Sequence, residues 1–344
     1  MLNRPSKTLT ISIAAYNMER LLPRALDSLV ESNYLSDLDI IIVNDGSTDS
    51  TAHIGQSYEQ RYPSSIRLLD KENGNYGSTI NASLKIARGK YYRLLDADDW
   101  YNTKSLDSLV SFLKNTTVDL VITPYVQHNE QTDEQTRFSL PDWANIGKEL
   151  LYDQCPFNPE RFYPPMHMST FKTALLRDNN ITITEGSAYT DFEFIIKPIP
   201  FIEQIAFLDE PVYQYRWGAS DQSVSISSWQ RNIEKGMGIT LGMVDYYNHL
   251  DLAHLPPMKR NVLLYEISSS VAEKFTYLLS FKPNRKTRFV MKNFEKTVHE
   301  KSDVIWERCI TTSNFPTKLY LQHPGLYHLS SWMIRTYYHS KGML

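Results

Sequence analysis

This 344-residue sequence has little cysteine, no long apolar run and no low-complexity tract. Its two cysteines, Cys155 and Cys309, stand far apart and form no metal-binding spacing, which argues against a disulfide framework and a cysteine zinc site. No run approaches the roughly 18–20 apolar residues that a membrane-spanning helix needs. The first residues, Met-Leu-Asn-Arg-Pro-Ser-Lys, have no apolar signal-peptide core. We therefore expect a reduced, cytoplasmic protein with two unpaired thiols.

The net charge of −3 at pH 7 gives no reason to expect nucleic acid as a partner, but the charge is unevenly distributed. Residues 281–344 contain 11 lysines and arginines against 4 aspartates and glutamates, a net charge of +7. A basic segment that also carries aromatic residues suits contact with an anionic membrane surface or an acidic acceptor. The alternative is a solvated helical face.

Short apolar runs alternate with amphipathic segments over the first 122 residues. We expect buried strands at residues 9–15, 38–43, 66–69, 91–95 and 118–122. Between them, apolar residues recur at the helical period, and the expected helices include residues 78–88 and one that is capped by Thr103. This alternation predicts an α/β fold with a mainly parallel sheet flanked by helices on both faces.

Polar residues stand at the carboxyl ends of these strands, where parallel sheets bind ligands. Tyr16 follows the first strand, Asp45 the second, the loop 73–77 the third, and residues 96–99, Asp-Ala-Asp-Asp, the fourth. Carboxylates this close repel one another and cannot be buried unpaired, so a divalent cation is their usual partner. An isolated Asp-x-Asp is also common in plain acidic turns. The convergence of four polar loops on one edge favours the cation site.

The pattern weakens after residue 127. Prolines among acidic and amide residues predict long loops over residues 127–165, followed by a short helix at 168–178 and a short strand at 181–183. Asp191 and Glu193 lie among aromatic residues, and they either serve a site or stand at the beginning of a helix.

The last third of the sequence favours helices from Trp229 onward. We place a domain boundary after residue 225. Residues 1–225 are expected to form a catalytic domain, and residues 226–344 a mainly helical region for acceptor, membrane-surface or oligomer contacts.

Taken in order, these loops resemble the motifs of the bacterial family 2 glycosyltransferases, whose GT-A fold is a nucleotide-binding α/β domain. The family's Pro-x-Tyr-Asn is residues 14–17, with Ala14 for proline, and its Val-Asp-Asp-Gly-Ser-x-Asp-x-Thr is residues 43–51, with Asn44 for the first Asp. The Asn-x-Gly loop is residues 73–81, with Ile80 where many relatives carry arginine. Residues 96–99 match Asp-x-Asp-Asp, residues 190–191 stand for the Glu-Asp pair, and residues 222–225 match Gln-Ser-x-Ser.

The resemblance implies an inverting, metal-dependent transfer of a sugar from a nucleoside diphosphate, UDP above the others, to an acceptor hydroxyl. It makes Asp191 the catalytic base, and Asp98, with Asp96, the ligands of Mn²⁺ or Mg²⁺. The residues assigned to the nucleotide and donor are Ala14, Ala15, Tyr16, Asn17, Asp45, Asn75, Gly77, Asp96, Ala97 and Asp98. The residues assigned to an acceptor or donor pocket are Asp99, Trp100, Arg216, Gln222 and Ser223.

Two of these assignments also follow from side-chain chemistry. Tyr16 can stack on a pyrimidine, and Asp45 can accept from the N3–H of uracil, which cytosine lacks. His167 is expected to be structural rather than a metal ligand.

Departures from the family pattern leave a second function open. Ala14, Ile80 and Thr190 each replace a residue that the family favours, so a catalytically inactive binding or scaffold subunit remains an alternative. The acceptor is expected to be a bacterial glycan, a lipid-linked saccharide or a protein, and neither it nor the donor sugar is fixed by the motifs. Peripheral membrane contact through the basic C-terminal region is expected, and homo-oligomer formation is left open.

Overall fold

The computed structural model describes residues 7–187, 189–218 and 226–341, with the side chains of residues 226 and 227 left out. The chain forms two compact units, one of residues 1–156 and 162–220 and the other of residues 157–161 and 221–344. This is a division by packing, and the functions assigned to the two parts remain predictions.

The first unit is built on an eight-stranded sheet with the order β3-β2-β1-β4-β10-β6-β11-β9. Its first four strands along the chain are parallel: β1 (Lys7–Ala15), β2 (Leu38–Asp45), β3 (Ile66–Lys71) and β4 (Gly89–Asp96). Nearly every residue of β1, β2 and β4 is buried, as expected of strands covered on both faces. The α/β sheet predicted from the apolar runs is confirmed.

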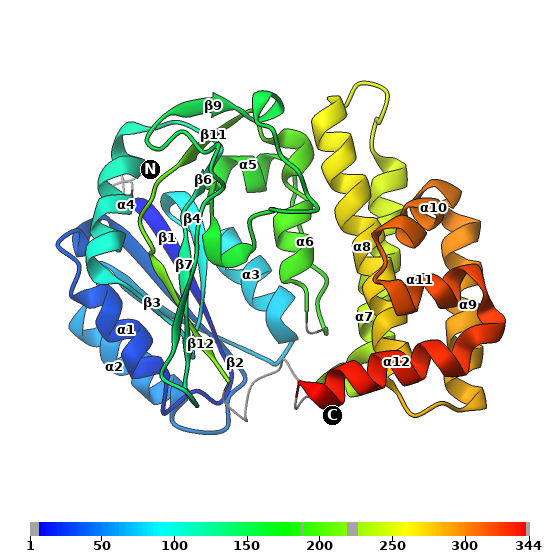
Figure 1. Cartoon of the computed structure of the whole chain (residues 1–344). Coiled ribbons are helices and arrows are strands. Elements are labelled where there is room, and N and C mark those ends of the chain that lie inside the picture. The colour runs from blue at the N-terminus through cyan, green and yellow to red at the C-terminus, as the bar shows by residue number, and fades with distance from the viewer. Residues whose placement is uncertain (1–6, 188, 219–225, 342–344) are drawn as a thin grey trace. The chain divides into compact units, whose positions relative to one another are not determined.

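Helices cover both faces of this sheet (Figure 1). The core on one face is formed by α1 (Leu22–Val30), α2 (Thr51–Arg61) and α4 (Thr103–Asn115), packed on the apolar side chains of β1 and β2. The other face carries α3 (Asn75–Ile86), which packs on β1 and β2, and α5 (Thr173–Asp178). Pro23 lies in the first turn of α1, where a missing N–H does little harm. The N-cap of α4 is Asn102 rather than the expected Thr103, because the Asn102 side chain accepts from the Ser105 N–H.

The prediction of a single helix at residues 168–178 is wrong. Ser169–Lys172 form β10, which runs antiparallel between β4 and β6 (Leu120–Ile122), and the helix begins only at Thr173. The sheet is therefore mixed rather than purely parallel. It ends in β11 (Gln204–Phe207) and β9 (Glu149–Leu151). The expected strand at residues 181–183 is also wrong, because no strand forms there.

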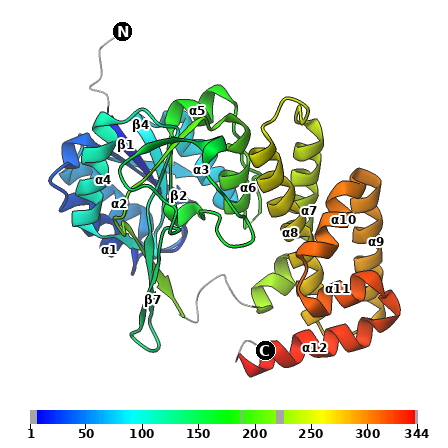
Figure 2. The same cartoon turned by 45° about the horizontal axis from the view of Figure 1, so that its top comes forward.

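The segment expected to be loops over residues 127–165 contributes to a second sheet, ordered β5-β12-β7-β8. Its strands are β5 (Trp100–Tyr101), β12 (Tyr213–Trp217), β7 (Tyr125–Asn129) and β8 (Gln135–Phe138). Figure 2 shows the hairpin of β7 and β8 projecting from the main sheet. This small sheet matters for the site because β5 directly follows the acidic stretch 96–99.

The second unit is helical, as predicted. Its helices are α7 (Ile226–His249), α8 (Pro257–Ser280), α9 (Arg285–Lys301), α10 (Asp303–Thr312), α11 (Phe315–Gln322) and α12 (Tyr327–Ser340). The expected apolar stripe of α8 is buried at Ile267, Val271, Phe275 and Leu278, and it forms the core of the unit. No helix in the described part of the chain is both long and apolar enough to cross a membrane.

Candidate functional site

Strand register brings the first predicted residues to one edge of the sheet. Ala14 of β1 lies between Val43 of β2 and Asp96 of β4, and Ala15 pairs with Asn44. Because all three strands are parallel, their carboxyl ends and the residues that follow share this edge. The polar loops that the sequence places after separate strands are therefore neighbours in space.

Hydrogen bonds join the first two loops. Asn17 adopts a positive φ of 55°, and its side-chain Oδ1 accepts from the Thr48 N–H at 2.8 Å. The Asn17 N–H in turn donates to Ser47 Oγ at 2.9 Å. Tyr16, between these contacts and the strand, remains 49% exposed. A tyrosine fixed on its backbone but open on its ring is suited to stacking on a planar base.

Asp45 is 3% exposed and is held by a set of donors on one oxygen. Its Oδ1 accepts from Lys71 Nζ at 2.7 Å and from the Gly74 N–H at 2.9 Å. Among the described residues no donor is recorded for Oδ2. The lysine compensates the buried charge, and the second oxygen is left for another donor.

The loop after β3 leads into α3 through Asn75, which has a positive φ of 64°. Gly77, in the first turn of α3, is pressed against the segment that precedes Asp191. A Cβ at Gly77 would lie 2.1 Å from the carbonyl oxygen of Thr184. The structure therefore gives Gly77 a packing role beside the predicted nucleotide contact.

The three carboxylates of the acidic stretch 96–99 are buried to different degrees: Asp96 and Asp98 are half-buried, and Asp99 is buried. Asp98 lies 3.9 Å from Arg216 Nη1. Asp99 is 1% exposed and accepts from the Tyr213 hydroxyl and from the Arg216 N–H, each at 2.6 Å. Oδ1 of Asp96 is buried and has no hydrogen-bond partner among the described residues. Alanine at position 97 is buried between them.

Burial and mutual repulsion disfavour ionisation in this cluster. Burial, followed by the charges of Asp98 and Asp191, raises the pKa of Asp96 to about 7. Burial and the charges of Asp98 and Asp96 raise the pKa of Asp99 well above its usual value. Such a pair gains stability from a cation that neutralises both groups.

His167 completes a group that could hold a metal ion. Ligand atoms of Asp96, Asp99 and His167 all lie within 4.8 Å of one another. Burial, aided by the Arg93 charge, lowers the pKa of His167 to about 3, so its ring is neutral and can act as a ligand. Its Nδ1 is buried without a hydrogen-bond partner among the described residues. Two orphaned buried atoms, Asp96 Oδ1 and His167 Nδ1, in a carboxylate and imidazole donor set fit a divalent cation.

Arg93 holds the backbone of His167 in place. It is fully buried on β4, and it donates to Thr170 Oγ1 at 2.7 Å and to the His167 carbonyl at 2.5 Å. The His167 ring is enclosed by Tyr125, Tyr213 and Tyr215. Sequence reasoning treated His167 as structural, and it had no signal for this site because 67 residues separate it from residue 99.

Asp191 is the first residue of α6 (Asp191–Ile196). Its charge acts on both Asp96 and Tyr76, so the structure brings it to the same edge although almost a hundred residues separate it from residue 96. Burial and the Asp96 charge raise the pKa of Tyr76 well above its usual value, so this hydroxyl stays protonated. Tyr76 is a site residue that the sequence did not single out.

Glu193 belongs to the scaffold. It is buried, accepts from the Thr184 N–H at 2.7 Å, and forms an ion pair with Lys197 at 2.7 Å. Thr190 occupies the N-cap of α6 but makes no side-chain cap hydrogen bond.

Trp100 lines a hollow of about 490 Å³ on the small sheet. The guanidinium of Arg24 stacks on its ring at 3.1 Å, and the His128 ring lies 4.7 Å from it. Arg216 Nε binds Glu130 Oε1 at 2.6 Å in the same hollow. Gln222 and Ser223, which were assigned to this pocket, lie outside the described residues.

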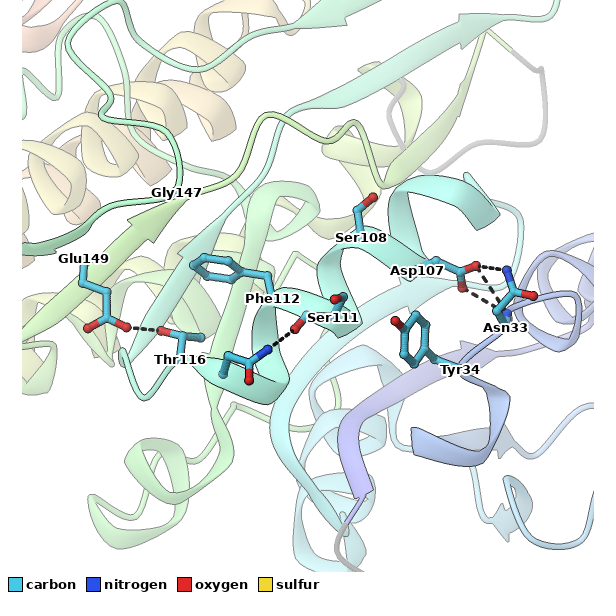
Figure 3. Close-up of a pocket in the computed structure, with 10 residues that line it drawn as sticks. Asn33, Tyr34, Asp107, Ser108, Ser111, Phe112, Thr116, Gly147 and Glu149 are labelled. Carbon is cyan, nitrogen blue, oxygen red and sulfur yellow. Dashed lines mark hydrogen bonds between the residues drawn. The ribbon is translucent and has the colours of Figure 1, made fainter.

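A larger hollow of about 950 Å³ runs along α4 and contains none of the predicted site residues (Figure 3). Its polar side chains are tied to one another: Asp107 binds Asn33, and Glu149 accepts from Thr116. The larger of these two hollows therefore lies away from the predicted site residues.

The comparisons with known proteins agree with this geometry. Residues 10–178 match the family model described as Glycosyl transferase family 2. An uncharacterized glycosyltransferase of Mycoplasma pneumoniae is 43% identical over 141 residues, which are 40% of this chain and 45% of the relative. A poly(ribitol-phosphate) beta-glucosyltransferase of Bacillus spizizenii is 24% identical over 97% of this chain and 56% of its own length. The chain spans about half the length of these two relatives.

The fold is shared over almost the whole chain with solved structures. TarS of S. aureus, residues 1–349 in complex with UDP, superposes with a TM-score of 0.65 at 19% identity, covering 97% of this chain and 92% of that one. The same protein in complex with UDP-GlcNAc gives 0.62 at 17% identity. These likenesses establish a GT-A fold followed by helices. The match over residues 10–178 identifies this part of the chain as a family 2 glycosyltransferase domain, and the glycosyltransferases among its relatives support a bacterial family 2 glycosyltransferase.

Proposed function

We propose that this chain transfers a sugar from a nucleoside diphosphate, UDP above the others, to an acceptor hydroxyl with inversion at the anomeric carbon. The observation that carries the proposal is the meeting of Ala14, Asp45, Asp96 and Asp191 at one sheet edge in a chain with the family's domain. Support for UDP comes from the structural neighbour in complex with that nucleotide.

The donor would lie across the ends of β1, β2 and β4. The Tyr16 ring would stack on the base, and Oδ2 of Asp45 would accept the N3–H of uracil, since the recorded donors of Asp45 bind Oδ1. The backbone of residues 14–17 and the turn at Asn75–Gly77 would enclose the ribose and base. Asp96, Ala97 and Asp98 would face the diphosphate.

The residues fit a divalent cation, Mn²⁺ or Mg²⁺, because Asp96, Asp99 and His167 bring ligand atoms together. Asp98, which the resemblance makes a ligand with Asp96, would be a further ligand. When bound, the ion supplies Lewis-acid neutralisation of the charge that develops on the departing diphosphate. A donor set that includes an imidazole favours Mn²⁺ over Mg²⁺, which prefers oxygen ligands.

Asp191 would take the proton from the acceptor hydroxyl as its oxygen attacks the anomeric carbon. Its carboxylate stands at the N-terminus of α6, whose dipole stabilises the charged form needed for this role. Tyr76 stays protonated beside it and is a hydrogen-bond donor in the same space. General base catalysis of this kind contributes about 10²–10⁴-fold to the rate.

The acceptor and the cellular site belong to the same proposal. Relatives named for transfer to poly(ribitol-phosphate) make such a polymer the first acceptor to test, before lipid-linked saccharides and protein glycans. Nucleotide sugars and two unpaired cysteines suit a cytoplasmic location.

A screen of nucleotide sugars for metal-dependent hydrolysis and transfer tests the proposal. We expect turnover of one UDP-sugar with Mn²⁺, and its loss in Asp191→Asn with UDP binding retained. The matched control is Asp142→Asn, an exposed carboxylate in the same unit. Nucleotide binding without turnover by the wild-type protein would instead favour the inactive scaffold alternative.

A further inference from the structure

One corner of the helical unit exposes large apolar side chains among basic ones. At the beginning of α9, Phe289 is 64% exposed, and at the beginning of α12, Trp332 is 63% exposed and Leu329 46% exposed. Leu326, just before α12, is also exposed. We call this set, together with Lys282, Arg285, Lys286 and Lys292, the corner patch.

The two helix beginnings are neighbours within the unit. Arg288 of α9 lies over the Tyr327 ring of α12 at 5.8 Å. Ser331 of α12 donates to the Leu279 carbonyl at 2.7 Å, at the end of α8 that leads into α9. Figure 1 shows α12 crossing this end of the helical unit. The apolar side chains of the corner patch therefore belong to one region rather than to scattered positions.

The outward direction of these side chains is set by helix periodicity. In α12, Tyr327, Ser330, Ser331 and Ile334 are buried, so Leu329 and Trp332 lie on the opposite face. In α9, the buried residues are Thr287, Met291, Phe294 and Val298. The opposite face of α9 carries Arg285, Phe289, Lys292 and Lys296.

The two chain segments that carry the corner patch contain basic residues and no acidic ones. Residues 281–294 contain five basic residues and no acidic one, and residues 308–344 contain no acidic residue at all. Exposed Trp, Phe and Leu flanked by Lys and Arg are typical of surfaces that insert into the headgroup region of an anionic bilayer. A protein partner or a second copy would also cover apolar residues, but a basic rim is better matched by anionic lipid.

We propose that the corner patch is a peripheral membrane-binding surface for anionic lipid. Trp332, Leu329 and Phe289 enter the interface, and Arg285, Lys286 and Lys292 contact lipid phosphates. The inference is independent of the transfer reaction, because none of these residues belongs to the carboxylate site.

Flotation of the full chain with vesicles tests this surface. We use phosphatidylcholine vesicles with and without about a third phosphatidylglycerol, whose negative surface attracts basic residues. The wild-type chain is expected to float with the anionic vesicles and to remain behind with the neutral ones. Equal or absent binding to both would overturn the proposal.

Two variants separate the apolar and the charged contributions. Burial of each aromatic side chain is worth about tenfold in partitioning, so Phe289→Ser with Trp332→Ser should lower it roughly a hundredfold. Each basic residue near the surface contributes about fivefold, so Lys286→Glu with Lys292→Glu should lower it by at least about 25-fold.

Controls are available elsewhere on the chain. Val304 is exposed just beyond the other end of α9, about 25 Å from Arg285 at 1.5 Å per residue, so Val304→Ser should leave flotation unchanged. Lys148 is exposed in the first unit, and Lys148→Glu makes the same kind of charge change outside the patch. If Lys148→Glu lowers flotation as much as the substitutions in the corner patch do, binding depends on the net charge of the chain and not on the patch. Unchanged flotation of Trp332→Ser combined with loss of a dimer in gel filtration would assign the patch to a second copy.

Discussion

Gly77→Ala sets two physical effects against each other. Alanine favours a helix over glycine by up to about 1 kcal/mol. At position 77, however, the new Cβ would lie 2.1 Å from the Thr184 carbonyl oxygen, where ordinary contact begins near 3.4 Å. Either α3 or the segment 183–186 must therefore move by more than an ångström.

That segment is closely tied to its surroundings. Asn81 exchanges two hydrogen bonds with the Ile183 backbone, at 2.8 and 2.9 Å, and the Gly186 N–H donates to the Gly74 carbonyl at 2.7 Å. Overpacking costs about 1–3 kcal/mol, and each hydrogen bond that is broken adds about 1 kcal/mol. We expect Gly77→Ala to lower the free energy of unfolding by about 2–4 kcal/mol, so the steric effect exceeds the helix propensity.

Denaturant unfolding measures this change, and turnover is measured in parallel. Because the displaced segment leads to Asp191, the substitution should reduce transfer more than it reduces UDP binding. Gly55→Ala in α2 is the matched control, since its Cβ would come close only to the flexible end of Leu68, at 2.9 Å, and would be in ordinary contact with Ile42 at 3.5 Å. A Gly77→Ala variant as stable and active as the wild type would refute the close packing of α3 against this segment.

Further expectations concern the base, the scaffold and the bound cation. Asp191→Asn should lower kcat by about 10²–10⁴-fold with UDP affinity unchanged in calorimetry, and a loss below tenfold would remove it as the base. Asp39→Ala should lower the free energy of unfolding by about 3–5 kcal/mol in denaturant titration, because it leaves Arg67 without its bidentate partner, and a change below 1 kcal/mol would contradict that ion pair. His167→Ala should weaken Mn²⁺ binding more than UDP binding, and an unchanged Mn²⁺ affinity would exclude the imidazole as a ligand.

The strands of the parallel half could be predicted because burial on both faces leaves a clear signal. Residues 9–15 and 38–43 are mostly apolar and are followed at once by polar loops. Since parallel strands end at one edge, the meeting of Tyr16, Asp45 and Asp96 followed from order alone. The helical second unit was equally accessible, because α8 repeats its apolar residues at the helical period.

The antiparallel additions could not be predicted because their signals are short and ambiguous. Ser169–Lys172 are only four residues with a single apolar side chain, and β7 and β8 are half-buried or exposed. The burial of Arg93 could not be explained without these strands. Arg93 lies inside an otherwise apolar strand, and its guanidinium finds a partner only because β10 brings Thr170 to it. The same insertion brings His167 to the carboxylates.

Part of the site could not be predicted because it depends on contacts between segments that are far apart in the sequence. Tyr76 was visible only as part of a turn, yet it lies beside Asp96 and Asp191. Arg24 gave no signal in α1, but it stacks on Trp100. Such placements depend on tertiary packing, which no local pattern encodes.

The most direct test of the central claim is thermal melting of the chain with UDP, in the presence and absence of Mn²⁺. A carboxylate site that binds cation and nucleotide together predicts a Mn²⁺-dependent rise in Tm of about 5–10 °C at UDP near one hundred times its Kd. Asp98→Ala should abolish that rise, and Asp142→Ala should retain it. No Mn²⁺-dependent shift in the wild-type chain, or the same shift in Asp98→Ala, would mean that residues 96–99 are only an acidic turn.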